Sequence, residues 1–115
     1  MGHGSRERGF QAAMLKVASS LRRQKEFAGV TCAYLEIASP GIREAIDGWA
    51  AKKAAEVRVL PYFVLSGRHV KSHIPEIIAE ARKKYGRSMK IILCPYLGYD
   101  EKIVSLAKRR ILEGR

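Results

Sequence analysis

A histidine beside an arginine, Arg68-His69, is the first group of residues in this sequence that could do chemistry. The pair follows an apolar run over residues 57–65, whose β-branched and aromatic side chains predict a buried strand. Gly67 ends that run, so an imidazole and a guanidinium stand where the strand would end. Ligands of open α/β sheets bind at the carboxyl edge of the strands. We therefore expect the active site at this edge.

A further histidine, His73, follows His69 by four positions, a spacing that on one helix would present two ligands on one face. Pro75, however, is tolerated in the first turn of a helix and predicts a start at 73 or 74. We therefore expect His69 in the preceding loop and His73 at the N-cap. A metal-ligand role for His73 stays open as the alternative.

The elements that must position these groups alternate along the chain. Residues 1–9 are polar and glycine-rich, which is typical of a loop. Helix-like and strand-like patterns then alternate, beginning with a helix over 8–26 and a strand over 30–37. The next helix has Ser39 as its N-cap, Pro40 in its first turn and an apolar stripe of Ile42, Ile46 and Trp49. A strand over 57–65, a helix over 74–84 that buries Ile74, Ile77, Ile78 and Ala81, a strand over 90–95 and a last helix capped by Asp100 follow. Such alternation with short connections predicts an α/β fold with a parallel sheet covered by helices.

Composition narrows the class of protein. At 115 residues, we expect a single domain over 1–115. No apolar run approaches the about 20 residues of a membrane span, and no signal peptide precedes the chain, so we expect a cytoplasmic protein. Cys32 and Cys94 lie in apolar runs and predict buried thiols rather than a disulfide, with a metal role as the alternative.

The net charge of +11 favours a polyanionic partner. Nucleic acid, an anionic membrane surface and a small molecule with several carboxylates all satisfy that condition. Charge alone does not choose among them. No nucleic-acid-binding motif is recognisable, and the chain carries no phosphate-binding loop of the nucleotide-dependent type.

An ordered set of short motifs resembles one family. The set consists of His3-Gly4-Ser5-Arg6, Tyr34-Leu35-Glu36, Gly67-Arg68-His69, Ile74-Pro75-Glu76 and Leu97-Gly98. No single motif is specific, but in this order and at these spacings they resemble the small, single-domain sirohydrochlorin chelatases. These enzymes insert cobalt, or in relatives nickel or iron, into a modified tetrapyrrole.

The resemblance implies a chelatase-like three-layer sandwich whose parallel sheet has the strand order 2-1-3-4. His3 would follow strand 1 and His69 would follow strand 3, so the two imidazoles would face each other across the switch point as the metal-binding and catalytic pair. Glu36 would accept a proton or support an imidazole. The substrate, through its carboxylates above all, would be bound by residues on the same loops: Ser5, Arg6, Gly67, Arg68 and Lys71.

Each of these residues also has an ordinary interpretation. His3 could belong to a vector-derived start, and His69 could be a loop residue bonded to backbone. Glu36 could be a surface carboxylate, and the three basic side chains could be solvated charges.

The family pattern has one gap, because no apolar strand precedes Met1-Gly2-His3. The first strand of the 2-1-3-4 order is central, and its loss would leave backbone groups unpaired. We expect that the true start lies upstream. Alternatively, another segment or subunit fills the slot, or the protein is degenerate.

The function expected from the resemblance is ATP-independent insertion of Co²⁺ into sirohydrochlorin on a cobalamin route, by a homodimer with no cofactor beyond the substrate metal. Nickel or iron could replace cobalt. The alternatives from other classes are a non-catalytic carrier of tetrapyrrole or metal, and a basic nucleic-acid-binding domain.

Overall fold

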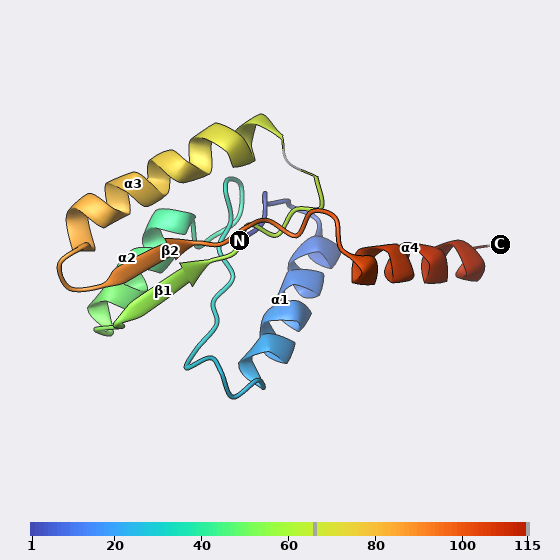
Figure 1. Cartoon of the computed structure of the whole chain (residues 1–115), viewed down its shortest axis with the longest axis horizontal. Coiled ribbons are helices and arrows are strands. Elements are labelled where there is room, and N and C mark those ends of the chain that lie inside the picture. The colour runs from blue at the N-terminus through green and yellow to red at the C-terminus, as the bar shows by residue number, and fades with distance from the viewer. Residues whose placement is uncertain (66, 115) are drawn as a thin grey trace.

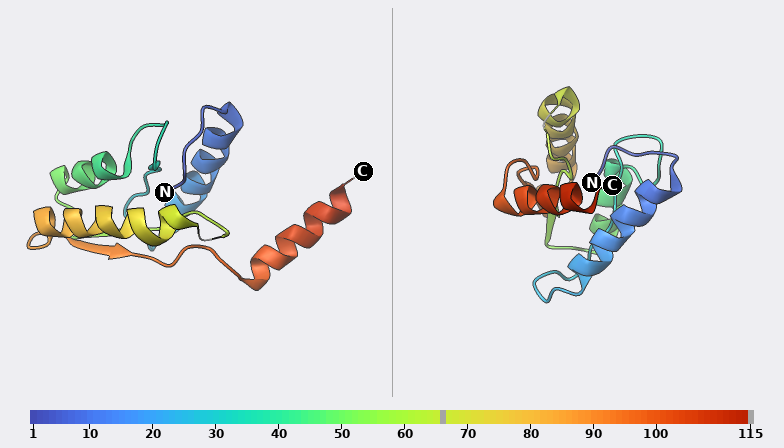
Figure 2. Two further views of the ribbon diagram at one scale, coloured as in Figure 1. Left: turned by 90° about the horizontal axis from the view of Figure 1, so that it is seen from above. Right: turned by 90° about the vertical axis from the view of Figure 1, so that its right-hand side faces the viewer.

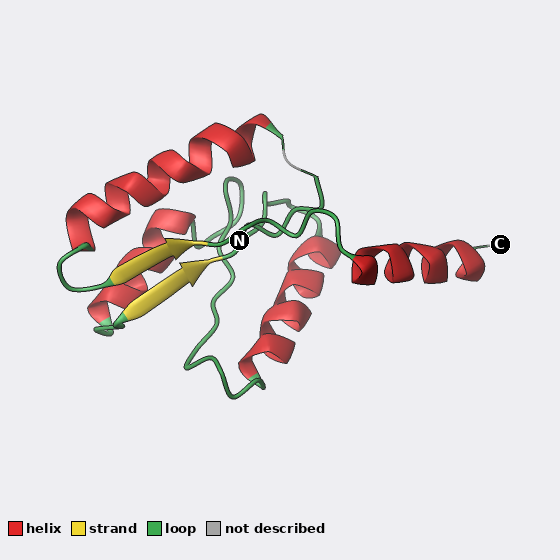
Figure 3. Ribbon diagram, viewed as in Figure 1, coloured by secondary structure: helices red, strands yellow, loops and turns green. Residues whose placement is uncertain are grey.

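The computed structural model, which describes residues 1–65 and 67–114, contains four α-helices and two strands (Figure 1). In chain order the elements are α1 (Arg8–Arg22), α2 (Ile42–Ala51), β1 (Glu56–Val59), the π-helical turn η1 (His69–His73), α3 (Ile74–Tyr85), β2 (Lys90–Leu93) and α4 (Glu101–Glu113). The predicted α/β fold with a parallel sheet is confirmed, although the strand expected between α1 and α2 is not formed as a regular strand and the other two are shorter than expected (Figure 3).

The centre of the sheet contains the first residues of the chain. β1 and β2 pair in parallel, from Glu56 opposite Lys90 to Val59 opposite Leu93. On the other side of β1, the Met1 amine donates to the Leu60 carbonyl, and the Tyr62 amide donates to the Met1 carbonyl over 2.7 Å.

The same N-terminal residues bond to a fourth segment on their far side. Gly2 N–H donates to Ala33 O, and Gly2 O accepts from Leu35 N, both over 2.9 Å. The spatial order is therefore 33–36, 1–3, β1, β2, which matches the 2-1-3-4 order that the resemblance implied. Residues 1–3 lie in the slot of the first strand but form no strand of their own, and Gly2 makes only an isolated bridge with Tyr34. The expectations of loop structure over these residues and of a missing regular first strand are therefore confirmed.

The short first segment explains why the second strand is irregular. We predicted a strand over 30–37, but Tyr34 forms only isolated parallel bridges, with Gly2 and with Gly41. Because residues 1–3 are its sheet neighbour, ladder bonds form only over residues 33–36. Similarly, β1 ends at Val59 rather than at 65, because Pro61 has no N–H to donate and its carbonyl closes a turn with Phe63 N.

Helix boundaries differ from expectation at three places. α1 ends at Arg22 rather than 26, and the Arg22 guanidinium donates to Val30 O. The N-cap of α2 is Gly41, with no side-chain cap, so the Ser39-Pro40 start was wrong. Pro40 instead offers its carbonyl to Tyr34 N over 3.0 Å. His69 does not lie in a loop, because η1 runs directly into α3.

Two helix ends follow the predicted chemistry. The Asp100 carboxylate accepts from Lys102 N over 2.8 Å and caps α4. Gly86 is the C-cap of α3, as expected.

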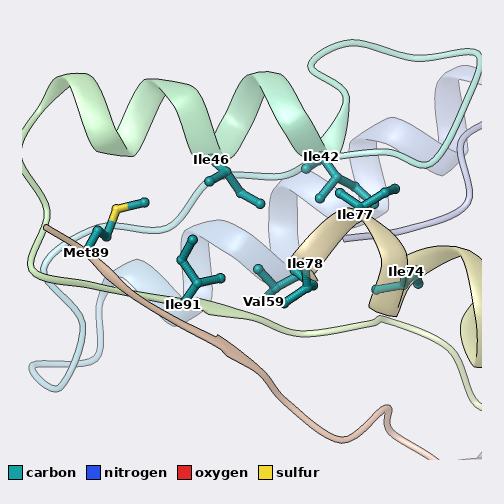
Figure 4. Close-up of a cluster of buried hydrophobic side chains, with 9 residues drawn as sticks. Ile42, Ile46, Val59, Ile74, Ile77, Ile78, Met89 and Ile91 are labelled. Carbon is teal, nitrogen blue, oxygen red and sulfur yellow. The ribbon is translucent and has the colours of Figure 1, made fainter. Parts of the chain in front are cut away.

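The core lies between the sheet and helices α2 and α3 (Figure 4). Ile74 and Ile78 are the most deeply buried side chains, with 0% and 1% of their surface exposed. The full cluster contains Ala33, Ile42, Ile46, Val59, Ile74, Ile77, Ile78, Met89 and Ile91. Of the side chains predicted to be buried on α3, only Ala81 is half-buried. Cys32 and Cys94 are free and half-buried rather than buried.

The remaining helices lie apart from this core. α1 packs near the central slot, where the Cys32 thiol lies 3.4 Å from Met14 O. α4 projects away from the body of the molecule in Figure 1 and in the left view of Figure 2. Within the described ranges, no helix combines the length and apolar character needed to cross a bilayer.

Candidate functional site

An imidazole and a carboxylate meet at the carboxyl edge of the sheet. His3 Nε2 lies 2.9 Å from Glu36 Oε1. The backbone sets this approach, because Glu36 N donates to His3 O over 3.0 Å and so places the two residues opposite each other on adjacent segments. Both side chains are open to solvent, with exposed fractions of 44% and 56%.

Gly4 allows the two segments to come this close. Its φ of +109° is one that L side chains rarely adopt. A Cβ on this residue would fall 1.8 Å from the Glu36 carbonyl oxygen, which is well inside van der Waals contact. The glycine of the His3-Gly4-Ser5-Arg6 motif is therefore required by the turn that follows His3.

The 2.9 Å between His3 Nε2 and Glu36 Oε1 is the distance of an imidazole–carboxylate ion pair. It is also compatible with two neighbouring ligands of an octahedral ion, which lie about 3 Å apart when each is about 2.1 Å from the metal. Among the described residues, no group of three or more histidine, cysteine or acidic side chains gathers around one point.

The second predicted imidazole cannot be placed. His69 opens η1, so its backbone follows the segment after β1, but its side chain lies outside the described part of the structure. The predicted meeting of His3 with His69 therefore stays a prediction. His73 occupies the N-cap position of α3 and is half-buried, but it makes no capping hydrogen bond.

The predicted substrate-binding residues lie on the segment after His3 and on the segment from Gly67 into η1. The side chains of Arg6, Arg68 and Lys71 are exposed. Gly67 is open to solvent, and its carbonyl accepts from Lys71 N over 3.2 Å. Ser5 has a local structural role, since its hydroxyl accepts from Glu7 N over 3.1 Å ahead of α1.

Burial shifts the pKa values of two groups that lie near the His3–Glu36 pair in sequence, the Met1 amine and the Tyr34 hydroxyl. The Met1 amine lies in the central slot, and desolvation lowers its pKa below the ordinary value. Burial likewise raises the pKa of Tyr34, which precedes the Glu36 segment.

Sequence reasoning missed the apolar side chains at this edge. Ile37, directly after Glu36, is 62% exposed, and Leu65 is 82% exposed. Both had been assigned to predicted strands, where apolar residues are expected to be buried. The only available signal was their position at the very end of each predicted strand.

A sequence profile described as CbiX matches residues 1–114. The chain belongs to the CbiX family. It is 32% identical, over 96% of its length and 89% of the relative, to a protein of Saccharolobus islandicus strain L.S.2.15 named sirohydrochlorin cobaltochelatase. It is 28% identical to the chloroplastic sirohydrochlorin ferrochelatase of Arabidopsis thaliana, covering 95% of this chain and 48% of that protein. The family that the motifs resembled is thereby confirmed.

Solved structures support the same fold. The cobalt complex of the sirohydrochlorin chelatase SirB from Bacillus subtilis subspecies spizizenii superposes with a TM-score of 0.88 at 27% identity. A structure of SirB from Bacillus subtilis with Fe³⁺ gives a TM-score of 0.83 at 26% identity. The match covers 97% of this chain but 47% of the cobalt-bound SirB chain, so this protein spans about half of SirB. The chelatase-like fold is confirmed.

Proposed function

We propose that this protein inserts a divalent metal ion into sirohydrochlorin without consuming a nucleotide. The observation that carries the proposal is the His3–Glu36 pair, 2.9 Å apart at the open edge of a CbiX-type sheet. Relatives with cobaltochelatase and ferrochelatase names act on this tetrapyrrole, which supports the substrate assignment. The metal is a substrate of the reaction, and we propose no resident cofactor beside it.

Cobalt is the metal we propose, as a step toward cobalamin, and nickel or iron is the alternative. The relatives of higher identity carry the cobaltochelatase name, whereas the plant relative carries the ferrochelatase name. Imidazole is a borderline ligand that suits Co²⁺, Ni²⁺ and Fe²⁺ alike. A comparison of the insertion rates with Co²⁺, Ni²⁺ and Fe²⁺ tests the choice of cobalt.

The chemistry divides between holding the ion and removing protons. His3, with His69 as the second imidazole, holds the metal until the macrocycle nitrogens replace water around it. Insertion releases two pyrrole N–H protons, and Glu36 accepts them one after the other beside His3 and passes each to solvent. Formation of the metal–nitrogen bonds supplies the driving force, so no nucleotide is needed. Arg6, Arg68 and Lys71 bind peripheral carboxylates of the substrate.

The test follows the tetrapyrrole absorbance after mixing purified protein, sirohydrochlorin and Co²⁺, with Ni²⁺ and anaerobic Fe²⁺ in parallel. The wild-type protein is expected to exceed the uncatalysed rate, and His3→Ala and His69→Ala are expected to lose most of that excess. His73→Ala is the matched histidine control and is expected to retain it. A wild-type rate equal to the uncatalysed rate would refute the proposal.

We also propose that the protein acts as a homodimer through α4. This helix projects from the body and exposes Val104, Ile111 and Leu112 along its length (Figure 1). Apolar helix faces are normally buried against a partner. Because the chain matches 47% of the cobalt-bound SirB chain, two copies approximate the length of that protein.

Light scattering measures the mass of the protein in solution and therefore tests the proposed dimer. The expected mass is twice the 12.9 kDa of one chain. Ile111→Glu is expected to give monomers, whereas Leu15→Glu, at another exposed apolar position, on α1, is expected to leave the dimer intact. A monomeric wild-type protein at micromolar concentration would contradict the dimer.

A further inference from the structure

Ile37 adopts a backbone conformation that its side chain disfavours. Its φ is +72°, and the amide of Ala38 donates to the carbonyl of Glu36 over 2.8 Å across it. This is a three-residue γ-turn of the positive-φ form, which is rare and strained. A positive φ is an outlier for any β-branched residue.

The positive φ of Ile37 occurs at an unusual position in the fold. Lys53, the only other non-glycine residue with a positive φ in the described ranges, follows the end of α2, where left-handed residues commonly terminate helices. Ile37 instead follows Glu36 directly, at the candidate site. Backbone strain that persists next to a site is a starting point for a functional hypothesis.

Packing does not compensate for the strain. The Ile37 side chain is 62% exposed, so its branched, apolar shape contributes little to the core. Glycine would fit the turn without strain, and asparagine is among the few other residues that visit this region. The turn therefore presents an isoleucine to solvent beside the His3–Glu36 pair at a cost to stability.

Other apolar side chains are exposed at the same edge of the sheet. Of the twelve large apolar side chains that are exposed in the described ranges, six lie on segments that leave the carboxyl edge: Ile37, Tyr62, Val64, Leu65, Tyr96 and Tyr99. Backbone bonds join these segments through the start of the chain, since Glu36 N donates to His3 O, Tyr62 N donates to Met1 O, and Gly98 N donates to Phe63 O. Four of the other six lie on α4.

Charged side chains accompany this apolar edge. Arg6 lies three residues after His3, and Arg68 lies three residues after Leu65; both are exposed. A ligand that suits the edge has an extended apolar face and anionic groups at its periphery. A tetrapyrrole with peripheral carboxylates has both features.

We propose that Ile37 is a substrate-binding residue whose strained turn holds its side chain against the apolar face of the macrocycle, next to the His3–Glu36 pair. This inference rests on the proposed function. The contact fixes the height of the ring over the pair, so it acts on binding of the macrocycle and not on capture of the metal. Asparagine at position 37 keeps the turn but removes the apolar contact.

The experiment compares wild type with Ile37→Asn, Ile37→Gly and Ile37→Leu, using Leu15→Asn on α1 as the exposed apolar control. Metal-free sirohydrochlorin is titrated into each protein and its Kd is read from the absorbance change, and KM and kcat for chelation are measured separately. Burial of one branched aliphatic side chain corresponds to roughly a tenfold change in affinity. Ile37→Asn and Ile37→Gly are each expected to raise Kd and KM about tenfold while kcat stays within about twofold, and Ile37→Leu is expected to restore most of the affinity.

The outcomes separate this inference from the proposed function. If wild type neither binds sirohydrochlorin nor inserts metal, the proposed function fails and the inference fails with it. If wild type is active but Ile37→Asn and Ile37→Gly bind the macrocycle as tightly as Leu15→Asn does, only the inference is overturned. Because glycine relieves the strain, Ile37→Gly keeps the test valid should the asparagine variant fold poorly.

Discussion

His3 Nε2 lies 2.9 Å from Glu36 Oε1, on two segments that are remote in sequence and joined by the backbone bond from Glu36 N to His3 O. The contact brings an imidazole and a carboxylate to one point at the edge of the sheet. It exists because the first three residues of the chain occupy the central slot of the sheet.

Replacement of Glu36 by glutamine separates its contact with His3 from its proposed role as a proton acceptor. The amide has the shape of the carboxylate and can still contact His3, but it cannot take up a proton. We expect Glu36→Gln to lower the chelation rate by about 10²-fold, the usual contribution of a general base, with little change in KM for sirohydrochlorin. Steady-state absorbance assays measure both constants. Glu26→Gln, at an exposed position outside the site, is the control, and an unchanged rate in Glu36→Gln would exclude the proton-transfer role.

Gly4 is expected to tolerate no side chain. An alanine Cβ would lie 1.8 Å from the Glu36 carbonyl oxygen, at a φ of +109°. We expect Gly4→Ala to reduce the free energy of unfolding by about 2–3 kcal/mol and to displace Glu36 from His3. Gly9→Ala, in α1 with no atom near its added methyl, is expected to gain up to about 1 kcal/mol. Urea unfolding compares the two, and equal stabilities would contradict the crowding at Gly4.

The link between α2 and α3 predicts a pH dependence at acid pH. The Tyr85 hydroxyl donates to the Asp47 carboxylate, and this bond, aided by Lys84, lowers the pKa of Asp47 below its ordinary value of 3.8. A lowered carboxyl pKa contributes stability that is complete above the ordinary value and is lost as the pH falls through the folded-state pKa.

We therefore expect Tyr85→Phe to cost about 0.5–1 kcal/mol at pH 7, since the pair is half-exposed, and to cost less below pH 3. Unfolding by urea at pH 2.5, 4 and 7 measures the difference. The same cost at every pH would place the effect of Tyr85 in packing rather than in its bond to Asp47.

Relief of the turn at position 37 is expected to stabilise the protein. A left-handed conformation costs an L residue about 1–2 kcal/mol, while glycine adds entropy to the unfolded chain. We expect Ile37→Gly to raise the free energy of unfolding by about 1 kcal/mol net. Thermal melts monitored by circular dichroism measure it, with Leu15→Ala as the control. A less stable Ile37→Gly would mean that the isoleucine packs usefully in the folded state.

Local signals in the sequence determined the elements that depend on near neighbours. The isoleucines at positions 74, 77 and 78 recur at helical spacing, and Gly86 terminates the helix, so α3 was predicted within one residue. The carboxylate of Asp100 marked the start of α4 in the same way. The edge of the sheet where His3, Glu36 and Arg68 lie also followed from their positions after apolar runs.

Tertiary structure alone decided the features that depend on contacts between distant segments. Residues 1–3 form no regular strand, yet Gly2 N donates to Ala33 O, and the amides of Leu35 and Tyr62 donate to Gly2 O and Met1 O. These bonds hold the start of the chain between the 33–36 segment and β1. The short length of this N-terminal segment, in turn, left the second strand without a ladder partner before residue 33. The 2.9 Å approach of His3 to Glu36 follows from that pairing, because the backbone bond from Glu36 N to His3 O joins segments that are remote in sequence. The γ-turn at Ile37 is closed locally by the bond from Ala38 N to Glu36 O, but a positive φ is disfavoured for a β-branched residue, so side-chain propensity does not predict it.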